Sequence, residues 1–273
     1  MTFLENVLRI LDAEMTKPTL YGWFHILSLV LTVLATVLLC RYGKKCSPRK
    51  VVLTVAVMVA LLEVYKQINY SFSYENGITF DYQWYAFPYQ FCSTPMYVGL
   101  LAGLTRKGRV HHAACAYLAT YSVFAGVCVM LYPATVFILT IGVNIQTMIC
   151  HGSMIVIGVY LLCSGYVKAE HKTILGAMPV FGICVLMAAG MNEIAYRTGL
   201  LETDTFDMFF ISPYTEPSLP VYSMVQKAVP FPWCLILYIL GFSLAAYLIL
   251  LIAIGVTHFI KKRRQAAIKV ATK

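Results

Sequence analysis

Charged residues are scarce in this chain. Asp, Glu, Lys and Arg make up 12% of its 273 residues, whereas apolar residues make up 60%. The mean hydropathy is +0.74. These values exclude a water-soluble domain and predict a polytopic membrane protein, in which each helical span needs about 20 apolar residues. Little chain remains between such spans, so a separate soluble catalytic domain is excluded as well.

Motifs typical of soluble cofactor chemistry are also missing. The nine cysteines include no CxxC pair, the six histidines include no HxxH pair, and no glycine-rich phosphate loop is present. These absences argue against a redox dithiol, a structural zinc site and a nucleotide site. No repeat or domain linker divides the sequence. We therefore expect a single membrane domain over residues 1–273, without a cofactor.

Seven apolar segments predict an all-α membrane protein, a bundle of seven transmembrane helices. We expect the spans at about 19–40, 51–69, 88–105, 110–131, 143–166, 174–196 and 233–258. Residues 1–17 carry three acidic residues and apolar residues at helical spacing, without the basic start of a cleaved signal peptide. They predict a short helix in the membrane interface.

The basic residues predict the orientation. Of 21 Lys and Arg residues, 16 lie on the side that holds the loop after the first span, whereas nine of the twelve acidic residues lie on the other side. By the positive-inside rule, the N-terminus is outside and the C-terminus inside. The net charge of +9 is then mainly a topology signal. Contact of these loops with anionic lipid is favoured over binding of nucleic acid, and we expect a multi-pass protein of the cell membrane.

Two segments on the predicted outer side are longer than turns. Residues 70–91 contain ten aromatic residues, and residues 197–232 are interrupted by four prolines, which prevent another span. One interpretation is a lid over the outer end of the bundle. The other is an ordinary aromatic belt with a floppy loop, and the sequence favours neither.

Polar residues of several spans fall at similar depth. Four of them are 14 to 17 residues from the nearest inner-side charge on their own span, or roughly 21 to 26 Å. Ionisable groups inside a membrane are costly, so such a layer suggests a functional site. The layer comprises His25, Lys66, Cys92 and His151, bracketed by Glu63, Asn192 and Glu193.

Structural explanations compete with that interpretation. Glu63 and Lys66 are three residues apart on one helix and can neutralise each other. His25 suits a hydrogen bond between helices. Asn192 and Glu193 can tie the long outer loop to the end of a helix.

Cys92 differs from the other eight cysteines in its surroundings. Pro88 suits the first helical position, so we expect Cys92 in the opening turns, where the helix dipole stabilises a thiolate. Pro95 cannot donate to the carbonyl of Phe91 and should bend the helix beside the thiol. His151 offers an imidazole at similar depth, and cysteine with histidine is a recurrent pair of nucleophile and base. Taken alone, Cys92 is better explained as a small buried apolar residue, and only its surroundings favour a functional role.

Four motifs resemble the YwaF-like family of integral membrane proteins. They are "FPYQFCSTPMYVGLLAGL", "TMICHG", "AGMNE" and "FFISPY". The family includes an animal acyltransferase that makes ether phospholipids. The resemblance implies seven spans and a catalytic pair of Cys92 and His151. Many relatives have a histidine two residues before the cysteine, where this chain has Gln90, so a histidine-based role at that position is in doubt.

Residues and resemblance together predict acyl transfer between a phospholipid and a lysophospholipid. Cys92 would attack the ester carbonyl after His151 has taken its proton, and the thioester would then pass to a hydroxyl group. Oxyanion stabilisation could come from Gln90, Asn192, Lys66 or amides at a helix end.

Other functions remain open. A layer of Glu63, Lys66, His25 and Glu193 also suits a transporter, a proton path or a receptor-like pocket. A metal bound by Cys92 and the two histidines is a third interpretation from ligand type, although we expect none.

Overall fold

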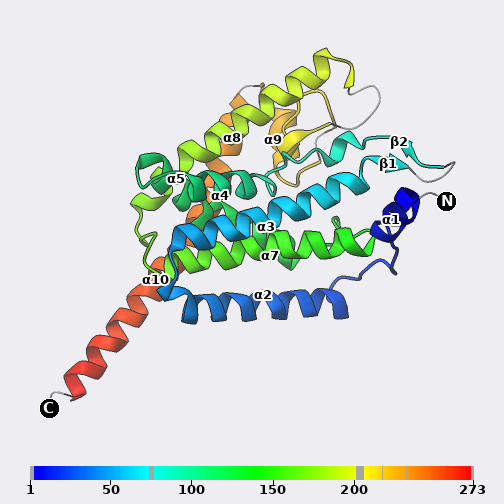
Figure 1. Ribbon diagram of the computed structural model, residues 1–273. Helices are drawn as coiled ribbons and strands as arrows, with labels where there is room; N and C mark the ends of the chain where they lie inside the picture. Colours follow the sequence, from blue (N-terminus) through cyan, green and yellow to red (C-terminus); the bar gives the residue numbers. More distant parts are fainter. Residues whose placement is uncertain (1–2, 74–76, 201–205, 217, 232, 272–273) are drawn as a thin grey trace.

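The computed structural model of the protein describes residues 3–73, 77–200, 206–216, 218–231 and 233–271, which form a bundle of helices (Figure 1). Within these residues, six helical stretches are long and apolar enough to cross a membrane, and a seventh is shorter. The six are α2 (Trp23–Tyr42), α3 (Pro48–Asn69), α5 (Arg109–Ala119) with α6 (Tyr121–Leu131), α7 (Ile141–Cys163), α8 (Lys172–Arg197) and α10 (Trp233–Ala271). The seventh is α4 (Thr94–Leu104). The chain is an integral membrane protein with helices in all seven predicted segments.

Short elements gather at one end of the bundle, opposite the C-terminus of α10 (Figure 1). They are α1 (Phe3–Leu11), β1 (Phe72–Ser73), β2 (Thr79–Phe80), α9 (Tyr222–Ala228) and the 3-10 helices Trp84–Ala86 and Met208–Phe210. We call this end the hairpin end. The opposite end, which holds the 3-10 helix Gly43–Lys45 and the loops after α2, α4 and α7, is called the basic end.

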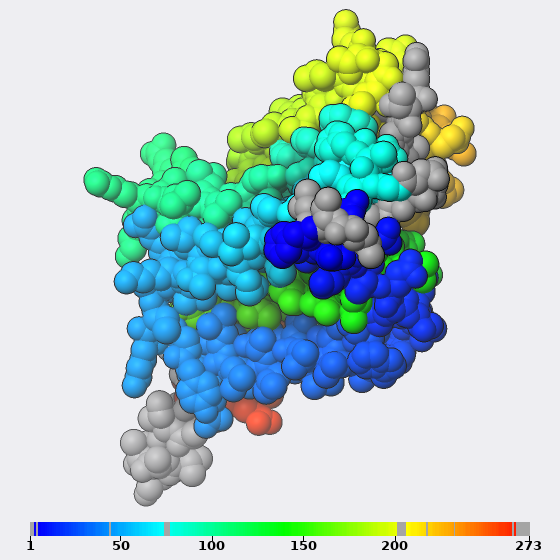
Figure 2. Space-filling model, turned by 45° about the vertical axis from the view of Figure 1, so that its right-hand side comes forward, coloured from blue at the N-terminus to red at the C-terminus, as the bar shows by residue number. Residues whose placement is uncertain are grey.

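The N-terminal helix is shorter than predicted. The interfacial helix was expected over residues 1–17, but α1 ends at Leu11, and residues 13–15 pair with the segment before α7 instead. Met15 N–H donates to the Leu139 carbonyl at 2.8 Å. In the space-filling view, this N-terminal segment lies on the surface beside the hairpin (Figure 2). The N-terminal segment therefore covers part of the surface at the hairpin end (Figure 2).

The third predicted span begins later than expected. Helix α4 starts at Thr94 rather than Pro88, and the N–H groups of Ser93 and Thr94 both donate to the Gln90 carbonyl in a turn. Pro95 is therefore a helix-starting proline, for which no N–H is needed. The Phe91 carbonyl, which we expected to lack a partner, accepts from the Thr94 hydroxyl at 2.8 Å. Cys92 thus precedes the helix.

The fourth predicted span is broken. Helices α5 and α6 meet at Thr120, whose backbone leaves the helical region at φ −127° and ψ −78°. Its hydroxyl donates to the Ala116 carbonyl at 2.7 Å, a bond that commonly bends helices.

Part of the outer segment 197–232, which one interpretation placed in a lid, belongs to the hydrophobic core. The Phe209 ring is fully buried, with centroids 5.8 Å from Phe91 and 6.3 Å from Phe181. Phe181 stacks on Tyr121 at 4.5 Å, so an aromatic cluster joins this loop to the bundle. Residues 201–205, 217 and 232 of the expected lid lie outside the described residues.

Candidate functional site

Cys92 lies in the turn before α4 and is partly buried. Its sulfur is close to its own backbone N–H and to the Ser93 hydroxyl, and its charged neighbours are Lys66 and Glu63 of α3. A cavity of about 30 Å³ lies beside this turn, and Cys92 shares it with Cys150 of α7. That volume holds about one water molecule.

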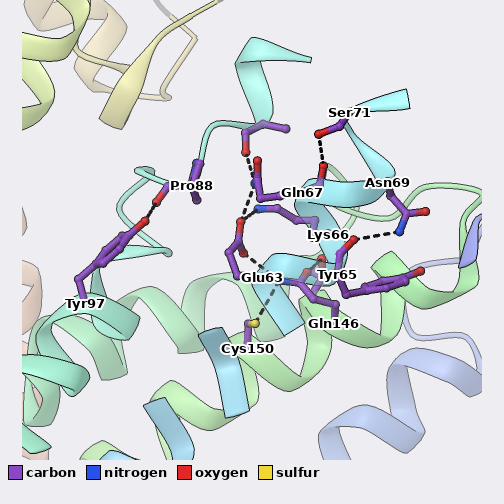
Figure 3. A network of polar contacts seen from close by, with 12 residues as sticks. Glu63, Tyr65, Lys66, Gln67, Asn69, Ser71, Pro88, Tyr97, Gln146 and Cys150 are labelled. Atoms are coloured by element: carbon purple, nitrogen blue, oxygen red, sulfur yellow. Dashed lines mark hydrogen bonds and ion pairs between the residues drawn. The ribbon is translucent and has the colours of Figure 1, made fainter. Parts of the chain in front are cut away.

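A polar network links α3 to α7 at this level (Figure 3). Glu63 is 7% exposed. It accepts from Lys66 Nζ at 2.7 Å, from Gln67 Nε2 at 2.8 Å and from Gln146 Nε2 at 3.1 Å. Gln146 Nε2 also donates to Cys150 Sγ at 3.2 Å. The network therefore links the charged pair on α3 to Cys150 at the edge of the cavity. It confirms the predicted pairing of Glu63 with Lys66.

His151 follows Cys150 on α7 and is 6% exposed. Its Nδ1 lies 2.8 Å from the Thr147 carbonyl oxygen. Because a carbonyl only accepts, Nδ1 carries the proton and Nε2 holds a free lone pair. Within the part of the chain that the structure describes, Nε2 has no hydrogen-bond partner, Cys92 included. A buried acceptor without a protein partner is uncommon, and a role in proton transfer is one explanation for it.

His25 is held elsewhere in the bundle. Its Nδ1 accepts from the Tyr21 N–H at 2.9 Å, so Nε2 donates to the Met130 carbonyl at 2.8 Å. Both nitrogens are satisfied, and the fully buried ring ties α2 to α6. Among the described residues, no group of three His, Cys, Asp or Glu side chains could hold a metal ion. The interpretation of a metal shared by His25, Cys92 and His151 has no geometric support.

Asn192 and Gln90 hold the loop at 207–209. The Asn192 side chain donates to the Met208 carbonyl at 3.0 Å and accepts from the Met208 N–H at 2.8 Å. The Gln90 side chain donates to the Asp207 carbonyl at 2.8 Å and accepts from the Phe209 N–H at 2.9 Å. The predicted tie between Asn192 and the outer loop is thus present. Gln90 attaches the same loop to the turn that carries Cys92.

The backbone of this loop is strained. Phe209 has φ 61° and Phe210 has φ 56°, in the left-handed region that residues other than glycine rarely adopt. Such residues cost about 1 to 3 kcal/mol each and persist only where surrounding contacts hold them. Besides the two amide side chains, the Tyr238 hydroxyl donates to the Phe209 carbonyl at 3.1 Å.

Glu193 ties the outer loop to the end of α8, as the structural explanation predicted. Its carboxylate is paired with Arg197 at 2.7 Å and accepts a short hydrogen bond from the Tyr214 hydroxyl on the exposed side of α8. Conversely, sequence reasoning missed Gln146 and Cys150. Their spacing of four residues places them on one helical face, but neutral polar residues in a span give only a weak signal.

Lys66 is a charged neighbour of Cys92, Cys150 and His151. Cys92 and Cys150 line one small cavity, and the Gln146 side chain links Cys150 to the Glu63–Lys66 pair. His151, the next residue of α7, is not among the described residues that line this cavity.

The chain matches the model of a known protein family. The sequence profile of the TMEM164 family matches residues 20–263. No curated protein and no solved structure matches the chain significantly. The matched region contains the described helices from α2 to α8 and most of α10, together with the Cys92 turn, the Glu63 network and the loop at 207–209. Because the match covers nearly the whole chain, the protein belongs to the TMEM164 family.

Proposed function

We propose that the protein is a membrane acyltransferase that moves a fatty acyl chain between lipids of the cell membrane through a thioester on Cys92. The unpaired Nε2 of the buried His151 is the observation that supports this most directly. It lies on the same turn of α7 as Cys150 and Ser153, which line the cavity that Cys92 also lines. A neutral imidazole with a free lone pair is the form that a general base requires.

The first half of the reaction forms the thioester. His151 Nε2 takes the proton of the Cys92 thiol, and the thiolate attacks the ester carbonyl carbon of a phospholipid. The tetrahedral intermediate then collapses, and the leaving oxygen of the lysophospholipid takes the proton from His151. Lys66 stabilises the thiolate before attack. Catalytic hydrogen bonds often form only in the substrate complex, and we expect the bond between Cys92 and His151 to form there.

The second half transfers the acyl group. The hydroxyl of a second lysophospholipid gives its proton to His151 Nε2 and attacks the thioester carbonyl. Cys92 leaves as a thiolate and recovers the proton. Gln90 and Asn192 are engaged with the loop at 207–209, so we assign the stabilisation of the oxyanion to the Cys92 backbone N–H, which lies next to the sulfur.

Intact-mass spectrometry tests the covalent step. Purified protein is incubated with a phospholipid of one defined acyl chain, and we expect a mass increase equal to that acyl group on Cys92. Neutral hydroxylamine, which cleaves thioesters, should remove it. Cys92→Ser should abolish the adduct and lower turnover by orders of magnitude while the folded protein persists. Cys150→Ser is the matched control, because Cys150 lines the same cavity and should be dispensable.

The pair is tested by a double-mutant cycle. Cys92→Ala and His151→Ala should each abolish transfer, and the double variant should be no worse than either, because residues that act as a unit are not additive. Independent, multiplying losses would mean separate roles. Wild-type transfer by Cys92→Ser would exclude the nucleophile and favour a transporter or a receptor-like bundle.

A further inference from the structure

We propose that the groove between α3 and α4 binds the acyl chain of the donor phospholipid and brings its ester to Cys92. This inference rests on the proposed function. The groove has a volume of about 470 Å³, within the usual range of roughly 300 to 1,000 Å³ for small-molecule sites. Ala60 and Val64 of α3, Tyr97 and Leu100 of α4, and Phe80 of the hairpin contribute to its walls.

Small residues explain why the groove opens only towards the hairpin end. Near the basic end, a Cβ atom on Gly99 would lie 3.0 Å from Ala56 Cβ, and one on Gly103 would lie 2.6 Å from Leu53 Cβ. The two helices therefore touch there. Closer to the hairpin end, the larger residues Met96 and Tyr97 of α4 line the groove.

The occupant follows from the surroundings of the groove. Val64 is 57% exposed and Tyr97 is 40% exposed, so the groove opens on the flank of the bundle, where a membrane supplies acyl chains. Its wall also has a polar stripe, formed by Glu63, Gln67 and Ser71 at intervals of four residues along α3 and into the hairpin. A chain lying against the apolar wall would place its ester and headgroup near this stripe.

Met96 connects the groove to the nucleophile. Its side chain lines both the groove and the cavity beside Cys92, so it forms the wall between them. Methionine is unbranched and changes rotamer readily, which lets such a wall open. The Tyr97 hydroxyl, one residue further, donates to the Pro88 carbonyl at 2.9 Å and fixes the chain just before the Cys92 turn (Figure 3).

Photocrosslinking tests the groove without requiring turnover. Cys92→Ser protein is placed in vesicles that contain a phosphatidylcholine with a diazirine on one acyl chain, and crosslinked peptides are identified by mass spectrometry. We expect crosslinks concentrated in peptides from residues 60–73 and 94–104. Ala60→Phe, which fills the groove, should abolish them. Ala35→Phe on the exposed face of α2 is the matched control and should leave them unchanged.

Val64→Trp is a second groove variant that controls for misfolding of Ala60→Phe. Position 64 is already exposed, so the larger ring narrows the groove from its rim without entering the interior of the bundle. Crosslinks spread over α2, α8 and α10 in proportion to exposure, or crosslinks that survive both groove variants, would overturn the inference. Different results would refute the proposed function and the lipid groove. Groove crosslinks without a thioester on wild-type protein would keep the lipid site and refute acyl transfer, whereas a thioester without groove crosslinks would refute only the groove.

Discussion

Replacing Asn192 by alanine should release the loop at 207–209 while the bundle stays folded. The change removes the partners of the Met208 N–H and carbonyl, both on a fully buried residue. Each buried group left unsatisfied costs about 1 to 3 kcal/mol, so the loss is about 2 to 6 kcal/mol. The strain at Phe209 and Phe210 adds to the tendency to open. The Gln90 and Tyr238 bonds alone should not hold the loop, which then opens locally rather than globally.

Asn144 provides a matched control. It is fully buried, accepts from the Ile138 N–H at 2.9 Å and donates to the Ile138 carbonyl at 2.8 Å, so Asn144→Ala removes the same two types of bond. Both variants should lose comparable thermal stability. Only Asn192→Ala should disturb the turn that carries Cys92, because Gln90 loses its partners when the loop at 207–209 opens.

Hydrogen exchange separates the two variants. Peptides that cover residues 206–216 should exchange faster in Asn192→Ala than in the wild type, and at the wild-type rate in Asn144→Ala. The rate of Cys92 alkylation by a membrane-permeant maleimide should change in the same selective manner. Equal exchange of this segment in both variants, or full protection in Asn192→Ala, would refute the conclusion that Asn192 holds the loop.

Three further predictions concern charges and topology. Burial raises the pKa of the Asp207 carboxyl above its ordinary value. The stability that Asp207 contributes is therefore complete below that ordinary value and is lost as pH rises through the folded-state pKa. Asp207→Asn should reduce the resulting decrease of the melting temperature with rising pH. Lys66→Met leaves the Glu63 carboxylate buried without its cation and should cost about 3 kcal/mol in chemical denaturation, whereas the double variant with Glu63→Gln should recover most of it. A cysteine introduced at Ser218 should be labelled from outside the cell, whereas one introduced at Ser47 should be labelled only from inside.

Each of these measurements has a contradicting result. A melting profile of Asp207→Asn parallel to that of the wild type would show that the carboxyl titrates alike in folded and unfolded chains. A double variant less stable than Lys66→Met would mean that the Glu63 carboxylate is stable without its pair. Labelling of both introduced cysteines from the same side would refute the prediction that the chain crosses the membrane five times between Ser47 and Ser218.

The helices were predictable because hydrocarbon thickness and backbone hydrogen bonding constrain spans to long apolar runs. The start of α4 was not. Pro88 and Pro95 each fit the first turn of a helix, and sequence alone does not decide between them. In the structure, Gln90 and Phe91 contact the loop at 207–209, more than a hundred residues further along the chain, and this contact fixes the turn before α4.

The site was predictable only where its contacts are local. The pairing of Glu63 with Lys66 follows from their spacing on one helix. Depth along a span placed His25 at the level of Cys92, but depth contains no information on which face of the bundle a side chain lies. Gln146 was missed for a related reason, since its contact with Glu63 joins residues 83 positions apart.

Two thiols line one cavity, and their surroundings differ. Cys92 is partly exposed, whereas Cys150 is buried and its sulfur accepts from the Gln146 side chain, which also donates to the Glu63 carboxylate. We expect Cys92 to be alkylated faster than Cys150, because its thiolate is better solvated and Cys150 is linked to that carboxylate. The double variant Glu63→Gln with Lys66→Met removes both charges, so the difference between their alkylation rates should shrink. If Cys92 keeps its full lead in that variant, its greater exposure rather than the ion pair explains its reactivity.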